Sequence, residues 1–148
     1  ADVEIIRLCV QSLQALGFKK VGIDLGHVDF VDGLDTVKRD ALLKGDYLTF
    51  GSIPKRGGIE LASDQSYLKS VYTLLSKELA TDQLFINKGL VKGLQYYTGI
   101  MFEIYVEGCR DIVASGGRYN QLLCKYGYDQ PAVGFAINLN EIIGESNE

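Results

Sequence analysis

The N-terminal stretch carries apolar residues at the spacing of one helix face. These residues are Val3, Ile6, Val10, Leu13 and Leu16. Intervals of three and four positions match the 3.6-residue period of an amphipathic helix. Asp2 stands where a helix N-cap is expected, and Gly17 fits a left-handed residue that ends a helix. A strand with alternating apolar positions is expected next, at residues 20–25 (KVGIDL), followed by a turn-rich junction at 26–33.

Residues 34–83 have a different pattern, which predicts a small helical insertion. One helix is expected at 34–43, and a second begins after a cap at Asp64. The loop at 51–58, which contains glycine, serine and proline, separates the two helices. The apolar face of the second helix consists of Tyr67, Leu68, Val71, Leu74, Leu75 and Leu79.

Strand signals dominate from residue 84 onward. The strongest strand covers residues 96–106, where alternate positions fall on opposite faces. One face carries Ile100, Phe102, Ile104 and Val106, and the other carries Met101, Glu103 and Tyr105. A hairpin turn at 107–108 leads to a partner strand near 110–114, and a last strand is expected at 131–137.

Between these strands, residues 115–117 (Ser-Gly-Gly) predict a sharp turn, and residues 118–125 predict a helix. Strands joined by hairpins, with helices at separate positions, are typical of an α+β fold built on an antiparallel sheet. We therefore expect one unit formed by residues 1–33 and 84–148, interrupted by the helical insertion at 34–83. Because the sequence opens within a helix pattern, we expect it to be a piece of a longer protein.

Composition favours a soluble globular protein. Of the 148 residues, 47% are hydrophobic and 23% are charged, and the formal net charge is −4. Basic residues are scattered singly or in pairs, so no nucleic-acid-binding face is expected. No apolar stretch approaches the roughly 18 residues of a membrane-spanning helix, and no apolar signal-peptide core is visible.

The cysteines Cys9, Cys109 and Cys124 lack the number and spacing of a disulfide framework or a zinc site. Such thiols are typical of a reducing compartment, so we expect a cytoplasmic protein without a metal or another cofactor. Cys9 lies on the apolar face of the first helix and is expected in the core. The single histidine, His27, has no nucleophile motif beside it, so a structural hydrogen bond is favoured over a catalytic base.

Three segments could carry binding chemistry. In residues 92–103 (KGLQYYTGIMFE), an unbroken strand would place Tyr97 and Glu103 on one face. This pair fits a site for an amine or an imidazole; a solvent-facing glutamate is the alternative. In residues 115–120 (SGGRYN), the glycines permit close approach of a ligand, or only a tight connection. In residues 131–142 (PAVGFAINLNEI), a glycine inside the strand indicates ligand approach or close packing.

Together these segments resemble the histidyl-tRNA synthetases. That family carries R-G-L-D-Y-Y-x-x-x-x-F-E, then G-G-R-Y-D, then A-V-G-F-A-x-G-L-E-R, and the counterparts here follow in the same order. The resemblance implies the C-terminal part of a class II aminoacyl-tRNA synthetase core: a six-stranded antiparallel sheet flanked by helices, with motifs 1 and 2 absent from this chain. It also implies that Tyr97, Tyr119 and Lys92 bind histidine. The residues that would support this pocket are Glu103, Arg118, Gly116 and Gly117.

Several positions depart from the family pattern. Lys92 replaces an arginine, which keeps the charge but loses the planar fork. The glycine, glutamate and arginine of motif 3 are Asn138, Asn140 and Glu141 here. The resemblance implies that this arginine binds the phosphates of ATP, which Glu141 would repel. A charge pair at about 4 Å is worth roughly 4 kcal/mol at an effective dielectric near 20. Replacing attraction by repulsion changes the interaction energy by about twice this amount, and even a third of that change lowers ATP affinity about a hundredfold. We therefore expect a lost ATP site and no adenylation of histidine.

A synthetase-like fold with these tyrosines and without this arginine is similar to the regulatory subunits of short-form ATP phosphoribosyltransferase. Their motif 3 ends G-F-A-x-x-L-x-x, close to residues 134–141, and their I-D-L-G-H-V strand resembles residues 23–28. The resemblance implies a non-catalytic subunit that is required for the first step of histidine biosynthesis. Such a subunit joins a short catalytic chain in a hetero-oligomer, takes part in feedback inhibition by histidine, and forms a homodimer through its missing N-terminal part.

Two other functions fit the sequence. The chain could be a fragment of a divergent but active histidyl-tRNA synthetase, which joins histidine to tRNA with ATP. It could also be an amino-acid-binding paralogue that serves another partner. The residues at 138 and 141 favour a regulatory subunit or such a paralogue over the ligase.

Overall fold

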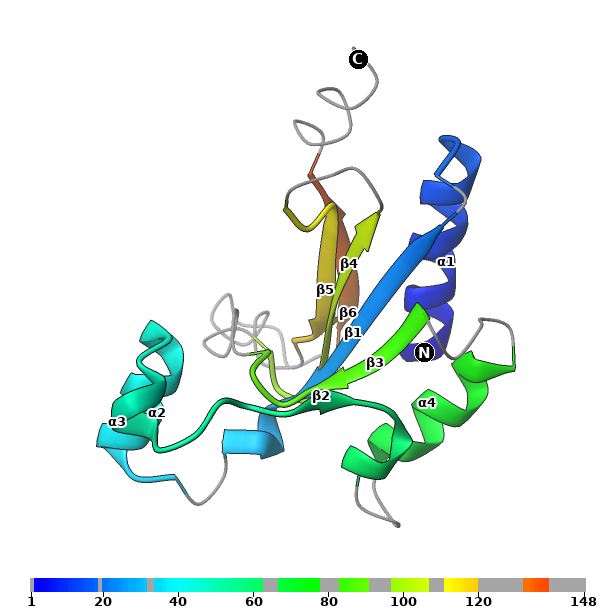
Figure 1. The fold of residues 1–148 in the computed structure, drawn as a ribbon. Helices are drawn as coiled ribbons and strands as arrows, with labels where there is room; N and C mark the ends of the chain where they lie inside the picture. The colour runs from blue at the N-terminus through cyan, green and yellow to red at the C-terminus, as the bar shows by residue number, and fades with distance from the viewer. Residues whose placement is uncertain are drawn as a thin grey trace, which may run out of the picture.

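A computed structural model describes most of the chain. The described residues are 2–18, 20–31, 34–62, 67–77, 83–90, 97–106, 111–119 and 132–138. Six strands form one sheet in the order β2-β3-β1-β4-β5-β6 (Figure 1). The strands are β1 (Val21–His27), β2 (Arg56–Gly57), β3 (Leu84–Asn87), β4 (Ile100–Val106), β5 (Ala114–Arg118) and β6 (Val133–Ile137). The helices are α1 (Asp2–Ala15), α2 (Thr36–Lys44), α3 (Tyr47–Phe50) and α4 (Tyr67–Ser76), with short 3₁₀ turns at Val28–Val31 and Ile59–Leu61.

The α+β class with helices beside a six-stranded sheet is confirmed, but the sheet is mixed rather than purely antiparallel. β4 pairs antiparallel with β1 from Val21 opposite Val106 to His27 opposite Ile100. β5 pairs antiparallel with β4, and β6 with β5. β3 instead runs parallel to β1. The connection between them is long enough for a parallel pair, since it contains α2, α3, the edge strand β2 and α4.

Helices α1 and α4 cover one face of this sheet, as Figure 1 shows. Alternate strand residues enter the core that they enclose. Members of this core include Ile6, Leu13, Val71, Leu75, Ile23, Leu25, Ile86, Phe102 and Ile104. We call this side the covered face. The opposite side, which carries Asp24, Glu103 and Tyr105, is called the polar face.

Cys9 belongs to the core on the covered face, as predicted. Its side chain is buried, and this burial raises the pKa of the thiol to about 12. The thiol therefore stays protonated at neutral pH and behaves as a small apolar residue.

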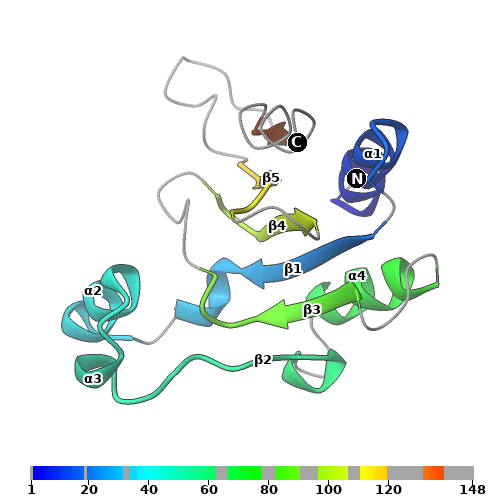
Figure 2. The same cartoon turned by 45° about the horizontal axis from the view of Figure 1, so that its top comes forward.

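The segment predicted as a helical insertion divides into two parts. Helices α2 and α3 pack on each other, at the end of the sheet away from α1 (Figure 2). α2 begins at the N-cap Asp35, whose Oδ1 accepts a hydrogen bond from the Lys38 N–H at 2.8 Å, and ends at Gly45 with φ 73°. In contrast, β2 pairs with β3 at the sheet edge, and α4 joins the core. Within the described residues of 34–83, α2 and α3 therefore lie outside the sheet and its main core.

The prediction for residues 115–117 is wrong. These residues do not form a turn, but lie inside β5, and Arg118 ends that strand instead of beginning a helix. A Cβ atom on Gly116 would lie 2.3 Å from the Gly134 carbonyl oxygen and 2.7 Å from Cζ of Phe102. The glycine is therefore needed for close packing within the sheet. In the sequence alone, such a glycine cannot be distinguished from one that marks a turn.

Two further boundaries differ from prediction. The partner strand expected near 110–114 runs from 114 to 118, and the strand expected from 96 begins at Ile100. Asp2 lies within α1, where its carboxylate binds side chains of other elements instead of capping the helix. Among the described residues, no helix is both long and apolar enough to cross a membrane.

Candidate functional site

Two tyrosines from separate segments meet at the polar face. Tyr97 precedes β4 and Tyr119 follows β5, and their ring centroids lie 6.5 Å apart at an interplanar angle of 42°. Backbone hydrogen bonds hold both segments. The Thr98 N–H donates to the Arg118 carbonyl at 2.7 Å, and the Tyr119 N–H donates to the Ala132 carbonyl at 2.8 Å. The ladder between the strands thus fixes the spacing of the two rings.

Two glycines make room for these rings. A Cβ atom on Gly117 would lie 3.0 Å from Cδ1 of the Tyr97 ring and 2.5 Å from the Ile100 carbonyl oxygen. A Cβ atom on Gly134 would lie 2.5 Å from the Tyr119 hydroxyl. Because Gly117 and Gly134 are paired across β5 and β6, the phenol groups lie against adjoining stretches of bare backbone. Larger residues at either position would displace a ring.

Glu103 gives this site a carboxylate. It lies half-buried on β4, opposite Ser115 of β5 and Asp24 of β1. The pKa of the Tyr97 phenol is raised mainly by burial, and further by the nearby Tyr119 and Glu103, whose negative charges would oppose ionisation. The phenol therefore keeps its proton at neutral pH and can donate a hydrogen bond. Two phenols near a carboxylate suit a ligand that carries an imidazole or an ammonium group.

Arg118 points to the covered face, away from the tyrosines. Its Nε donates to Asp2 at 3.1 Å (Oδ1) and 3.3 Å (Oδ2), and the Tyr67 hydroxyl donates to Asp2 Oδ2 at 2.7 Å. Asp2 is 1% exposed. This contact joins α1, α4 and β5, so the strand that precedes Tyr119 is tied to both helices.

A second polar cluster was missed at the sequence level. Arg56 Nε donates to both oxygens of Asp24 at 3.0 Å, and its Nη2 donates to Oδ1 at 2.8 Å. Asn87 Nδ2 donates to Asp24 Oδ2 at 2.9 Å, and the Tyr105 hydroxyl donates to Oδ1 at 3.3 Å. Arg56 Nη2 also donates to the Tyr105 hydroxyl, and the guanidinium carbon lies 4.0 Å from the centre of the Phe85 ring. Hydrogen bonding to Asp24 raises the pKa of Arg56, so this arginine stays charged.

One signal in the sequence could have found this cluster. Asp24 stands in a strand whose alternate residues Val21, Ile23 and Leu25 are buried. A carboxylate at the centre of such a strand needs a partner. No feature of residues 51–58 identifies Arg56 as that partner, because the pair is separated by 32 positions.

Comparison with known proteins identifies the family. A sequence model described as histidyl-tRNA synthetase matches residues 54–142, more than half of the chain. The chain belongs to the histidyl-tRNA synthetase family. A curated relative in Geobacter sulfurreducens, named ATP phosphoribosyltransferase regulatory subunit, is 32% identical over 180 aligned positions. That alignment covers 94% of this chain and 41% of the relative, so the chain spans about two fifths of the relative's length.

Solved structures share the fold of this chain. A Bacillus halodurans protein described as an ATP phosphoribosyltransferase regulatory subunit/histidyl-tRNA synthetase has a TM-score of 0.72 at 24% identity. The match covers 94% of this chain and 48% of that protein. A chain of the ATP phosphoribosyl transferase (HisG:HisZ) complex from Thermotoga maritima has a TM-score of 0.64 at 17% identity, covering 91% of this chain and 59% of that one. At these identities the likeness concerns the fold.

Part of the predicted histidine site lies within the described residues. Tyr97, Tyr119 and Glu103 come together, whereas Lys92, Asn140 and Glu141 lie outside the described residues. The histidine-binding and ATP-site roles of these positions therefore stay predictions.

Two other residues singled out in the sequence, Asn138 and His27, lie at the ends of strands. Asn138 is exposed just after β6, and its backbone N–H donates to the Val113 carbonyl at 2.7 Å. His27 ends β1 opposite Ile100, and its role stays a prediction. The described part of the chain shows no cluster of three or more His, Cys, Asp or Glu side chains that could hold a metal ion.

Proposed function

We propose that the protein to which this chain belongs is a regulatory subunit of ATP phosphoribosyltransferase. It makes no bond itself, but is required for the first step of histidine biosynthesis and takes part in feedback inhibition by histidine. The observation that carries this proposal is the name shared by the curated relatives, which are 27–32% identical over 94–97% of the chain.

The residues on the polar face support a histidine ligand. Tyr97 and Tyr119 lie on the bare backbone of Gly117 and Gly134, with the Glu103 carboxylate nearby. A phenol hydroxyl can donate to or accept from an imidazole nitrogen, and a carboxylate attracts an ammonium group. The proposed ligand is therefore free histidine, held near the junction of β4, β5 and β6. Lys92 is proposed as a further contact.

The nucleotide part of the family site is proposed to be lost. Asn138 adds a side chain where the family has a glycine, and Glu141 places a negative charge where the family has an arginine. Phosphate binding requires a cation or backbone N–H groups at that position. Without one, the protein would bind histidine and not activate it.

The proposed partner is a short catalytic phosphoribosyltransferase chain, in a cytoplasmic hetero-oligomer. A chain that shares this fold comes from the ATP phosphoribosyl transferase (HisG:HisZ) complex of Thermotoga maritima, which supports the proposal. The physical basis of regulation is linkage. Bound histidine shifts the assembly only as far as its affinities for two states of the assembly differ. The protein is further proposed to dimerise through the part that precedes this chain.

One observation favours a second function. The family model that matches the chain describes histidyl-tRNA synthetases, so a divergent histidine–tRNA ligase is the alternative. An amino-acid-binding paralogue with another partner is the third possibility.

The test is reconstitution with the intact protein. A short phosphoribosyltransferase chain from the same genome is assayed for ATP phosphoribosyltransferase activity alone, with the protein, and with the protein and histidine. We expect activity only in the mixture, and a decrease when histidine is added. If the catalytic chain is fully active alone and does not associate with the protein, the regulatory role is rejected. Association without an effect of histidine would reject feedback through this site.

A further inference from the structure

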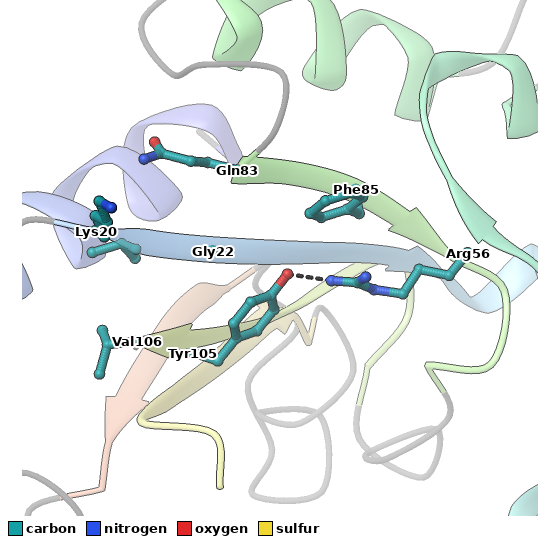
Figure 3. A pocket seen from close by; sticks show the side chains of 8 residues that line it. Lys20, Gly22, Arg56, Gln83, Phe85, Tyr105 and Val106 are labelled. Atoms are coloured by element: carbon teal, nitrogen blue, oxygen red, sulfur yellow. Dashed lines mark hydrogen bonds between the residues drawn. The ribbon is translucent and has the colours of Figure 1, made fainter. Parts of the chain in front are cut away.

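A groove lies on the polar face over the beginning of β1. Its volume is about 460 Å³, within the range of small-molecule sites. Figure 3 shows Phe85 and Tyr105 on opposite sides of the strand at Gly22, with Lys20 at one end and Arg56 at the other. The groove is distinct from the tyrosine pair. Tyr105 is four residues along β4 from Met101, which pairs with the glycine beneath Tyr97, a separation of about 13 Å.

The aromatic walls are set in place by the sheet. A Cβ atom on Gly22 would lie 2.2 Å from Cε2 of Tyr105, so this ring lies directly against bare backbone. The Phe85 ring is fixed by the Arg56 guanidinium, which stacks on it at 4.0 Å. Phe85 and Tyr105 belong to the strands on either side of β1, and the Arg56 guanidinium lies 4.0 Å and 5.5 Å from the centres of their rings. The groove is therefore flanked by aromatic faces against which a planar group can pack.

Two cationic side chains, Arg56 and Lys20, line the groove. Arg56 uses Nε and Nη2 to bind Asp24 and Tyr105, and within the described part of the chain no hydrogen bond engages its Nη1. The side chain of Arg56 is 41% exposed, whereas that of Asp24 is 11% exposed and lies beneath the guanidinium. Lys20 adds a second cation. None of the described lining residues is acidic, so an anion would meet donors and no opposing carboxylate at the surface.

We propose that this groove binds a small aromatic anion. The planar ring packs against the Tyr105 ring, which itself covers Gly22, and next to Phe85. The anionic group accepts hydrogen bonds from Arg56 Nη1 in the field of Lys20. An aryl phosphate and an aryl carboxylate share this chemistry. The site does not depend on the proposed regulatory role, so the failure of one leaves the other unchanged.

The experiment is an NMR titration of the intact protein with phenyl phosphate and with benzoate. Phenol and inorganic phosphate are the matched half-ligands. We expect saturable shifts at Gly22 and Gln83 with one or both aryl anions, and about tenfold weaker binding of each half-ligand, since ring and anion contribute separately. The stronger of the two aryl anions identifies the anionic group.

Variants distinguish binding in the groove from nonspecific attraction of anions to surface lysines. Lys20→Ala should lower the affinity for the aryl anion about threefold. Lys55 is an exposed lysine outside the groove, so Lys55→Ala should leave this affinity unchanged. Phe85→Leu should weaken it about tenfold. The proposal is overturned if neither aryl anion saturates, if the half-ligands bind equally well, or if Lys20→Ala and Lys55→Ala have the same effect. Shifts centred on Tyr97 and Tyr119 instead of Gly22 would also overturn it.

Discussion

The two faces of the sheet hold the same chemistry in different surroundings. On the covered face, Asp2 accepts hydrogen bonds from Arg118 and from a tyrosine hydroxyl, beneath α1 and α4. On the polar face, Asp24 does so with Arg56 and another tyrosine. Each cluster joins segments that are far apart in sequence. The aspartate side chains are 1% and 11% exposed, but the arginine side chains are 24% and 41% exposed.

This difference indicates what each cluster does. A carboxylate and an arginine that are both largely removed from water depend on each other, and the loss of one leaves an uncompensated charge. An arginine that keeps much of its exposure can be solvated again and can also meet a ligand. The Asp2–Arg118 cluster on the covered face therefore holds β5 against the helices. The Asp24–Arg56 cluster on the polar face presents a cation beside an open groove.

The largest expected effect tests how well the covered face excludes water. The Cys9 thiol has a pKa raised from 9.0 to about 12 by burial. Above pH 9 the unfolded chain loses this proton while the folded chain keeps it, so the free energy of unfolding falls as pH rises. Below pH 9 this contribution is fully present. The decrease reaches about 4 kcal/mol by pH 12.

Because tyrosines and lysines titrate in the same range, the measurement compares the protein with its Cys9→Ala variant. Urea unfolding is followed from pH 8 to the highest pH at which the transition is reversible. The difference between the two proteins should shrink steadily above pH 9. Parallel curves would mean that water reaches the thiol and that the covered face is less closed than described.

The next effect contrasts the two carboxylates directly. Asp2→Ala should lower the free energy of unfolding by about 3 kcal/mol, because the hydrogen bonds that Arg118 and Tyr67 donate to a buried carboxylate are lost. Asp24→Ala should cost about 1 kcal/mol, because Arg56 can return to water. Urea denaturation measures both. The exposed neighbour variant Glu4→Ala should remain within about 0.5 kcal/mol of the parent. Equal losses from the two aspartates would remove the distinction between the faces.

The sequence predicts those parts of the fold that depend on residues close together in the chain. Periodic patterns located α1, β1 and β4 and placed Cys9 in the core, because burial of alternate or 3.6-spaced residues is a local signal. The Ser-Gly-Gly segment was misjudged, because glycine serves both turns and close strand packing. In β5 the second requirement applies, at Gly116 and Gly117.

The candidate site was less predictable. Tyr97 was named from the strand pattern and Tyr119 from a resemblance, and the structure places their ring centroids 6.5 Å apart. Their spacing depends on strand pairing that no local pattern specifies. Arg56 was passed over as a loop residue next to a glycine pair, because its partners Asp24 and Phe85 come from other strands. Side-chain clusters assembled across a sheet are set by its topology.

A smaller effect is expected at the glycine beneath Tyr119. Gly134→Ala would place a methyl group 2.5 Å from the Tyr119 hydroxyl, which must move. Histidine affinity, measured by calorimetry on the intact protein, should fall about tenfold, the loss of one well-formed polar contact. The control is Gly99→Ala, whose new methyl group would meet nothing nearer than 3.6 Å. Equal affinities for both variants would show that histidine does not use this ring.

The smallest effect concerns one hydroxyl. Tyr97→Phe keeps the ring on Gly117 and removes its hydrogen-bonding oxygen. Histidine affinity should fall about threefold to tenfold with little change in unfolding free energy, because one neutral hydrogen bond contributes about 1 kcal/mol. Tyr105→Phe, in β4 but outside the pocket, should leave histidine affinity unchanged. If both variants weaken histidine equally, the ligand lies elsewhere on the polar face.

The most direct measurement for the whole account is histidine-dependent ATP–pyrophosphate exchange by the intact protein. With Asn138 and Glu141 in place of the family's glycine and arginine, we predict no exchange above background at saturating histidine, while histidine still binds in calorimetry. Exchange that requires histidine and rises with ATP would mean that the chain belongs to an active ligase, and the regulatory account would be wrong.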